Sequence, residues 1–466
     1  MRSSPDSTGL SPSERRAAFS LAGIYALRML GLFLILPVFA LYAEGLPGVT
    51  PLLVGVAVGI YGLTQALLQI PFGLLSDRIG RKPVIVGGLL VFALGSVVAA
   101  MADDIWLIIL GRALQGSGAI AAAVMALAAD LTRESVRMRA MAFIGVSIGG
   151  AFILALVLGP LLDHWIGVPG IFWLTAGLAL SGVAVTIFLV PRPARSSVHR
   201  DAEPVPAQFR AVLRQPELLR LDIGVFILHM TLTALFLVLP LELLEAGLAK
   251  ESHWLLYLPV MLVSMALMVP FVIYAEKRRH LKGVLLGAVA ALAAAQVFLY
   301  IGGGSLPVMV MALVVFFVAF NLLEATLPSL VAKTAPSAAK GTAMGFFTSA
   351  QFLGAFTGGL LGGWAHQAAG VGGVFLFGAV VALIWLLVAA GMAHPQYLSN
   401  QLLDVGPLNG DDASRLERDL LEIPGVAEAV VVAEEGVAYL KVDRRTLDQS
   451  ALDRLAADAG PAVTVQ

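Results

Sequence analysis

Residues 73–82 read Gly-Leu-Leu-Ser-Asp-Arg-Ile-Gly-Arg-Lys, a short charged stretch between two apolar runs at 52–72 and 84–101. Each run is long enough to cross a bilayer as a helix, because a span needs about 20 apolar residues. Such runs recur along the chain, and we expect twelve spans, at 19–43, 52–72, 84–101, 105–129, 142–161, 170–190, 219–241, 254–275, 283–301, 306–330, 344–364 and 373–393. The chain is therefore predicted to be an all-α polytopic membrane protein with a lipid bilayer around its spans.

The composition of the whole chain supports this class. Of the 466 residues, 59% are hydrophobic and only 13% are charged, and the net charge is −1. Soluble domains carry about 25% charged residues, so the composition disfavours a soluble enzyme, a nucleic-acid-binding protein and a disordered scaffold. The chain has no cysteine, which excludes disulfides, thiol catalysis and thiolate metal sites.

The basic residues predict the orientation of the spans. Of the 30 Lys and Arg residues, 21 lie in the N-terminus and in alternate loops, whereas the opposite set of loops holds only Lys250. Cytoplasmic loops are enriched in positive residues. Both termini are therefore expected in the cytoplasm.

Three sequence matches indicate an internal duplication. Leu32–Pro37 resembles Leu235–Pro240, and Ala140–Phe143 resembles Ala343–Phe346, both at an offset of 203 residues; the third match joins Pro71-Phe72 to Pro270-Phe271. Two parallel repeats of six helices are typical of rocker-type secondary transporters, whose substrate site lies near the midplane between the halves. We expect a cytoplasmic N-terminus at 1–18, six-helix bundles at 19–190 and 219–393, and a cytoplasmic linker at 191–218.

The charged stretch at 73–82 is a candidate cluster of ion pairs between helix ends, and we call its residues the latch residues. Glycines allow close backbone packing, a carboxylate can cap a helix, and an arginine offers a planar fork to a carboxylate. A partner carboxylate is available at the end of the fourth run. The alternative is a solvated basic loop that only sets the topology. The expected latch residues are Gly73, Asp77, Arg78, Gly80, Arg81, Lys82 and Asp130.

Several polar side chains lie inside apolar runs, where they are costly and normally face protein or water. A carboxyl group in a low-dielectric setting suits proton cycling near neutral pH, and histidine titrates in that range. Each of these residues also has a structural alternative. Glu324 could form a static pair with an arginine, and Arg112 could be bonded to backbone carbonyls. For His229 we favour the alternative, a hydrogen-bonded packing role. The candidate residues for proton coupling and the substrate cavity are Arg28, Tyr61, Gln65, Arg112, His229, Asn321 and Glu324.

The composition changes from about Ser399 onward. Residues 400–466 carry 13 acidic and 6 basic side chains and no run long enough to span a membrane. The pattern predicts strands at 401–406, 426–433, 436–443 and 462–466 and helices at 411–422 and 446–458. This βαββαβ order is that of a small α/β ferredoxin-like domain. Metal delivery is disfavoured because the domain has no thiol pair, and we expect it to dock on the cytoplasmic face or to bind a regulator.

These motifs together resemble the major facilitator superfamily, and within it the YajR-type transporters that carry such a tail. The resemblance rests on the stretches 28–33, 60–66, 73–83 and 111–119 and on the appended domain. It implies the two-repeat fold of that superfamily and proton-driven export of drugs or metabolites across a bacterial inner membrane. It also implies that Asp77, Arg81 and Asp130 latch the outward-open state and that Arg112 takes part in proton coupling.

The fifth run matches the antiporter signature of that superfamily only in part, since Ala155 and Leu162-Asp163 stand where the signature has glycines. Gly159 and Pro160 are retained, and we expect them to bend the fifth helix.

The expected function is that of a secondary active transporter, most simply a monomeric proton antiporter that exports small, partly hydrophobic compounds. The proton gradient is the energy source, and no cofactor, metal, nucleic acid or enzymatic activity is expected. The alternatives are a proton-coupled importer or uniporter, and a ligand sensor that signals through the C-terminal domain.

Overall fold

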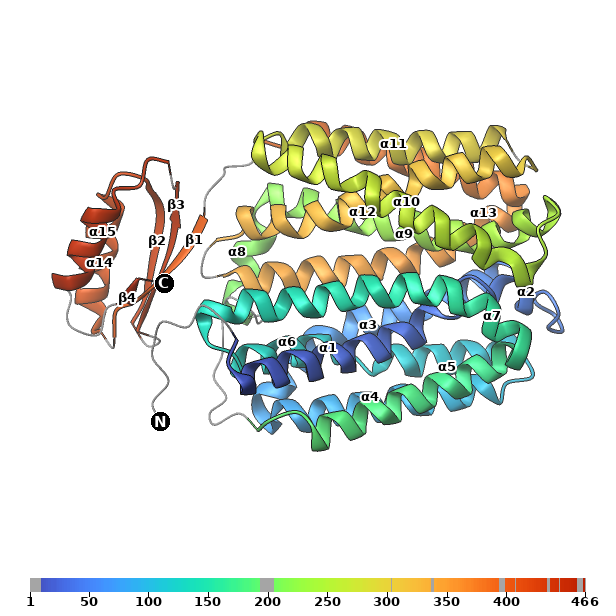
Figure 1. Cartoon of the computed structure of the whole chain (residues 1–466), viewed down its shortest axis with the longest axis horizontal. Helices are drawn as coiled ribbons and strands as arrows, with labels where there is room; N and C mark the ends of the chain where they lie inside the picture. The colour runs from blue at the N-terminus through green and yellow to red at the C-terminus, as the bar shows by residue number, and fades with distance from the viewer. Residues whose placement is uncertain are drawn as a thin grey trace.

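A computed structural model describes residues 10–192, 205–302, 304–336, 339–393, 399–406, 408–433, 436–443, 445–458 and 464–465. It shows an elongated bundle of helices with a small α/β domain at one end (Figure 1). We call the end of the bundle beside that domain the proximal end and the opposite end the distal end. Ten helices of the described part are long and apolar enough to span a membrane, and two of them, of 50 and 51 residues, contain a non-helical break. The predicted helical membrane fold with a separate C-terminal domain is confirmed.

The first half of the chain forms one bundle. Its first helix begins at a capping box, in which Ser11 and Glu14 satisfy each other's backbone N–H groups. The third helix begins at the cap Thr50, followed by a proline at its first position. The helices are α1 (Pro12–Phe33), α2 (Phe39–Ala43), α3 (Pro51–Ile79), α4 (Arg81–Ala100), α5 (Ile105–Ser117), α6 (Ala121–Asp130) and α7 (Glu134–Phe188).

Two predicted spans in this half are interrupted. The first run begins seven residues earlier than expected, at Pro12, and breaks over residues 34–38 between α1 and α2. Pro37 lies in that break and has no N–H to donate. The fourth run, expected to be continuous over 105–129, breaks over residues 118–120 between α5 and α6. Both corrections leave irregular backbone inside the bundle, where protein rather than lipid surrounds it.

The second half of the chain forms the other bundle. Its longest helix turns back on itself at Gly370, whose φ of 67° favours glycine, just as α7 does at Gly167 with a φ of 66°. Residues 1–9 of the expected N-terminus and 193–204 of the expected linker lie outside the described residues. The elements are η1 (Pro206–Gln208), α8 (Phe209–Leu213), α9 (Pro216–Glu245), η2 (Lys250–Ser252), α10 (His253–Lys277), α11 (Leu281–Ile301), α12 (Leu306–Thr334) and α13 (Lys340–Ala390).

The two bundles pack tightly toward the distal end. There α3 and α13 approach each other closely through glycines. A Cβ on Gly59 would lie 2.7 Å from the carbonyl oxygen of Phe356, and a Cβ on Gly55 would overlap the carbonyl oxygen of Gly359. The buried apolar residues of the distal part of the first bundle join those of the second bundle in one continuous cluster. The proximal part of the first bundle has its own apolar cluster, which the second half joins only through Phe352 among the described residues. The halves are therefore closed at the distal end.

The C-terminal domain has the predicted ferredoxin-like order. Its elements are β1 (Ser399–Asp404), α14 (Gly410–Leu421), β2 (Val426–Val432), β3 (Val437–Val442), α15 (Gln449–Asp458) and β4 (Thr464–Val465). The strands pair antiparallel in the order β2-β3-β1-β4, with Leu403 opposite Ala438. Helices α14 and α15 lie on the side of the sheet away from the bundle (Figure 1).

Candidate transport site

The predicted latch residues come together at the proximal end, around the junction of α3 and α4. The guanidinium of Arg81 pairs with the Asp77 carboxylate, donates to Ser76 Oγ at 2.8 Å, and lies 3.4 Å from Asp130 Oδ2 at the end of α6. The side chains of Arg81 and Asp130 are 2% and 0% exposed. The cluster is thus a buried bridge that ties α3, α4 and α6 together, not a solvated loop.

Glycine is required at the turn that carries this cluster. Gly80 has a φ of 95° and a ψ of 150°, a conformation that is open essentially only to glycine. Gly73 packs so closely against α6 that a Cβ on it would lie 3.0 Å from that of Ala122. Lys82 Nζ donates to the carbonyl oxygen of Val190, just beyond the end of α7, at 2.5 Å, and Arg78 is exposed. The latch residues therefore serve different contacts within one bundle.

The corresponding position in the second repeat carries a simpler ion pair. Lys333 Nζ on α12 donates to both carboxylate oxygens of Glu276 on α10 at 2.9 Å. Lys333 stands 203 residues after Asp130, and Glu276 stands 199 residues after Asp77. Glu276 and Lys333 therefore occupy the places of Asp77 and Asp130 in the second repeat, with a cation where the first repeat has the carboxylate of Asp130. The Glu276 side chain is 46% exposed, and exposed pairs contribute little to stability.

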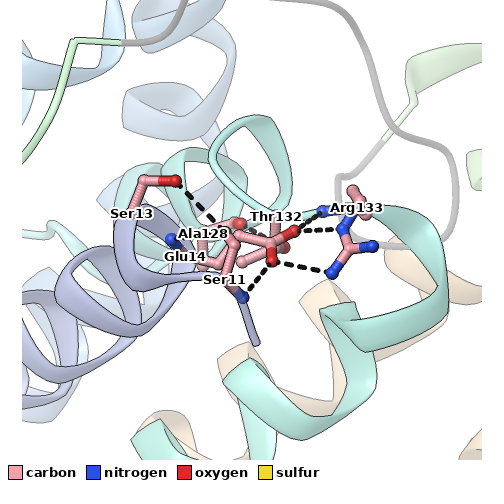
Figure 2. Close-up of polar contacts among 6 residues, drawn as sticks. All are labelled: Ser11, Ser13, Glu14, Ala128, Thr132 and Arg133. Atoms are coloured by element: carbon pink, nitrogen blue, oxygen red, sulfur yellow. Dashed lines mark hydrogen bonds and ion pairs between the residues drawn. The ribbon is translucent and has the colours of Figure 1, made fainter. Parts of the chain in front are cut away.

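A second buried carboxylate fixes the start of α1 at the proximal end (Figure 2). Oε1 of Glu14 accepts hydrogen bonds from the backbone N–H and from Nε of Arg133, both at 2.9 Å, and Oε2 accepts from Arg133 Nη2 at 3.1 Å. The same carboxylate closes the capping box with Ser11 at 2.8 Å. Glu14 therefore joins the first turn of α1 to the start of α7.

Arg28 lies five residues before the end of α1 at Phe33 and is completely buried. Its Nη2 donates to Gln65 Oε1 at 2.6 Å and to the carbonyl oxygen of Gly118, in the break between α5 and α6, at 3.1 Å. The guanidinium carbon lies 5.7 Å from the ring centre of Tyr61 and 5.5 Å from that of Phe92. The structure thus brings Arg28, Gln65 and Tyr61 into one buried group.

Arg112 also lies over the Tyr61 ring, with its guanidinium carbon 5.2 Å from the ring centre. Each of its three nitrogens has an acceptor: Nε donates to the Ala57 carbonyl at 3.3 Å, Nη2 to the Val58 carbonyl at 3.2 Å, and Nη1 to Gln115 Oε1 at 2.9 Å. In this conformation Arg112 is hydrogen-bonded to backbone carbonyls of α3. That contact is the one expected if Arg112 has a structural role.

In the second bundle, His229, Glu324 and Gln351 meet from three helices, α9, α12 and α13. Gln351 Nε2 lies 2.8 Å from His229 Nε2 and 3.4 Å from Glu324 Oε1, and His229 Nε2 lies 3.7 Å from Glu324 Oε2. The Glu324 side chain is 40% exposed and that of His229 is 14% exposed. The partner of Glu324 is therefore this histidine and amide rather than an arginine, and His229 faces a carboxylate rather than only packing.

The hydrogen bonds of His229 are compatible with one neutral tautomer. His229 Nδ1 lies 3.2 Å from the carbonyl oxygen of Val225, which can only accept, so Nδ1 carries the proton. Nε2 is then the acceptor for an N–H of Gln351, and the second N–H of the same amide points to Glu324. A proton added to Nε2 removes that acceptor and creates a cation beside the carboxylate.

Aromatic rings lie between the two polar groups. Tyr61 packs against Phe352, the residue after Gln351, with ring centres 6.2 Å apart. On the other side, Phe320 lies 5.8 Å from the His229 ring and 6.4 Å from Phe152 of α7. The expected single constellation is thus divided into an arginine group and a histidine–carboxylate group.

Three residues show the reach of the sequence-based expectations. Gln351 was missed, although it is the only amide in the eleventh run and that feature could have drawn attention to it. Asn321 lies one turn from Glu324 on α12, and its buried Nδ2 has no hydrogen-bond partner among the described residues. Gly159 stays within helical backbone, and a Cβ there would lie 2.6 Å from the Leu34 carbonyl oxygen. The bend at Gly159 and Pro160 remains a prediction.

Comparison with known proteins gives two family matches. The model of the Major Facilitator Superfamily matches residues 21–359, and that of the YajR YAM domain matches residues 407–456. The chain is 48% identical to the inner membrane transport protein YajR of Escherichia coli, covering 96% of this chain and 98% of that protein. It is 30% identical to the multidrug resistance protein MdtH of Yersinia pestis over 63% of this chain and 73% of that protein.

Solved structures share the fold at low identity. The human organic anion transporter MFSD10 superposes with a TM-score of 0.61 at 22% identity, covering 81% of this chain and 100% of that one. A bacterial homolog of the lysosomal transporter Spinster, in an inward-facing conformation, gives a TM-score of 0.65 at 15% identity over 83% of this chain and 98% of that one. At these identities the similarity establishes the arrangement of helices alone.

Proposed function

The chain belongs to the major facilitator superfamily of membrane transporters, and on that premise we propose that it is a proton-coupled antiporter that exports small, partly hydrophobic compounds. The observation that carries the proposal is the group formed by His229, Gln351 and Glu324. It couples two groups that can bind a proton within a bundle whose helices move against a partner bundle.

Proton binding at this group changes which contacts are possible. While His229 is neutral, the amide of Gln351 donates to both His229 and Glu324 and holds α13 against α9 and α12. A proton on His229 Nε2 displaces the amide, and a proton on Glu324 removes the charge that the amide solvates. Either event favours a different arrangement of the three helices, which is how a proton gradient can bias a two-state transporter.

The latch provides the second element of the proposed cycle. Arg81, Asp77 and Asp130 hold the proximal parts of α3, α4 and α6 as one unit. Alternating access by rocking requires each bundle to move largely as a body. We therefore assign the cluster the role of keeping the first bundle rigid at the end where, by the distribution of basic residues, the cytoplasm lies. Both termini and the C-terminal domain are then cytoplasmic.

The test is a fluorescence assay of ΔpH in inverted membrane vesicles that contain the full chain. Ethidium, benzoate and chloramphenicol serve as cationic, anionic and neutral probes. We expect at least one probe to collapse ΔpH with the wild type and not with Glu324→Gln or His229→Phe. Glu44→Gln, which removes an exposed carboxylate far from the group, is the matched control and should behave as the wild type.

Other outcomes select other functions. Probe flux without any change in ΔpH would indicate a uniporter, and a proton flux in the same direction as the probe would indicate a symporting importer. A ΔpH response that persists in both Glu324→Gln and His229→Phe would contradict the proposed coupling group. No flux of any probe, together with ligand binding, would favour a sensor.

A further inference from the structure

The buried cations of the first bundle are unevenly satisfied. Arg112 has a hydrogen-bond acceptor for each of its three nitrogens. Arg28 is equally buried, but its Nε and Nη1 have no hydrogen-bond partner in the part of the chain that the structure describes. Buried donors without an acceptor are rare in native proteins and call for a missing partner such as an ion or a ligand group.

Tyrosine side chains lie near Arg28, and the ring centre of Tyr61 is 5.7 Å from its guanidinium carbon. The hydroxyl of Tyr61 is buried and also lacks a partner among the described residues. Tyr25 lies one turn before Arg28 on α1 and is itself buried. An arginine can only donate and a tyrosine hydroxyl can donate, so the group offers an excess of hydrogen-bond donors. The missing partner must therefore be an acceptor.

The electrostatics of the site favour an acceptor that carries negative charge. The side-chain acceptors that Arg28 and Arg112 reach in this structure are the neutral amide oxygens of Gln65 and Gln115. Both guanidinium carbons lie within 6 Å of the Tyr61 ring, at 5.7 and 5.2 Å. These distances place the two guanidinium carbons at most about 11 Å apart. Like charges in a low-dielectric interior repel each other, and an anion beside them would offset that repulsion.

The broken fourth span adds to the positive potential. Helix α6 (Ala121–Asp130) begins inside the bundle, directly after the Gly118 carbonyl that accepts from Arg28. Its N-cap Ile120 has no side chain that can accept from the first backbone N–H groups. The N-terminal end of a helix carries a partial positive charge and exposed N–H groups that favour anions.

We propose that Arg28, together with the hydroxyl of Tyr61 and the start of α6, forms a binding subsite for a small anion or for the carboxylate of a larger organic molecule. The inference deepens the proposed function, because it names a chemical group that the transport site binds. The guanidinium is enclosed in the present conformation, so the anion reaches it only in another conformation of the chain. Binding then accompanies the conformational cycle.

Binding is measured by equilibrium dialysis of the purified full chain in detergent, with radiolabelled chloride and radiolabelled benzoate as probes. The ionic strength is held constant with the bulky sulfonate MES, and no pH gradient is present. We expect saturable binding of at least one probe, lost in Arg28→Gln and weakened about tenfold in Tyr61→Phe, the loss typical of one hydrogen bond to a charged group. Arg210→Gln, which removes an exposed arginine, should bind as the wild type.

The two probes distinguish the two sources of the anion. Benzoate binding that chloride does not reproduce assigns the subsite to an organic carboxylate, and chloride binding that benzoate does not displace assigns it to an inorganic ion. Absence of saturable binding in the wild type overturns the proposal. So does binding that is unchanged in Tyr61→Phe, a variant that keeps the ring and the packing and remains informative if Arg28→Gln fails to fold.

The readout is independent of proton coupling. Binding without any ΔpH response would leave the subsite standing and contradict the antiport mechanism. A ΔpH response of the wild type without anion binding would support the antiport mechanism and contradict the proposed subsite.

Discussion

The glycine contacts between α3 and α13 allow the distribution of conformations to be shifted by one methyl group. A Cβ on Gly59 would lie 2.7 Å from the carbonyl oxygen of Phe356, whereas ordinary van der Waals contact of a Cβ begins at 3.4 Å. Gly59→Ala therefore forces the two helices apart in the distal-closed state, and it should not do so in a state in which the bundles have separated there. Overpacking of a well-packed interface costs about 1–3 kcal/mol, which corresponds to a shift of about 5- to 150-fold in the ratio of the two states.

The chain has no cysteine, so a pair of spin labels can report this shift without removing native residues. Labels attached through Trp165→Cys on α7 and Glu251→Cys in η2 lie on opposite halves at the distal end. We expect the distance distribution between them to move to longer values in Gly59→Ala. Gly87→Ala is the matched control, because nothing lies within 4 Å of a Cβ at that position. An unchanged distribution in Gly59→Ala would refute the reasoning that the glycine contacts hold the distal end closed.

Three further predictions concern the latch, its turn and the tail. Arg81→Gln removes the Arg81 cation from the fully buried Asp130, so we expect a loss of about 3–5 kcal/mol in the free energy of unfolding. The thermal midpoint in detergent should fall, and Arg81→Lys should partly restore it. An unchanged midpoint would mean that the Arg81–Asp130 pair contributes nothing. Gly80→Ala places a side chain at a φ of 95° and should lower the free energy of unfolding by about 1–3 kcal/mol. Gly87→Ala is the control, because it should introduce no such backbone strain. Equal thermal midpoints for the two variants would contradict this prediction. Asp443 lies 3.5 Å from Arg279 in the α10–α11 turn, and a hydrogen bond from the backbone N–H of Arg445, aided by Arg279, holds the pKa of Asp443 below its ordinary value. The contact is therefore complete above the ordinary carboxyl pKa and is lost only as the pH falls through the lowered pKa of Asp443. Chemical crosslinking of the tail to the bundle should follow the same pH dependence and should weaken as salt is added. Crosslinking that is insensitive to pH and to salt would argue for an apolar contact.

The positions of the spans and of the tail elements could be predicted because they depend on patterns that are local in the sequence. Hydropathy defines a span almost regardless of its neighbours, and the strands of the tail were placed within two or three residues. The breaks at 34–38 and 118–120 could not be predicted, because apolar composition continues across both. Prolines do not mark such breaks reliably here, since Pro71 and Pro240 lie inside uninterrupted helices.

The candidate site was predicted in membership but not in pairing. A charged side chain in an apolar run is conspicuous by its cost alone, which is why Arg28, Arg112 and Glu324 could be singled out. Which of these groups meet depends on how helices distant in sequence cross, and the sequence contains no signal for that. The same limitation explains why Gln351 was missed. A neutral amide costs less than a charge, so its position became informative only when His229 and Glu324 were found beside it.

The two breaks in the first bundle make the halves of the molecule mechanically unequal. Two of the six spans of that bundle are divided, the fourth near its middle and the first toward its distal end, and the carbonyl of Leu34 at the latter division rests directly against Gly159 of α7. In the second bundle α9 and α12 run uninterrupted for 30 and 29 residues. A continuous helix resists flexing along its whole length, whereas a divided one yields at the gap. The second bundle should thus act as a stiff lever. The first bundle is held rigid at its proximal end by the latch, and it should yield at its two gaps, one of which lies beside Arg28.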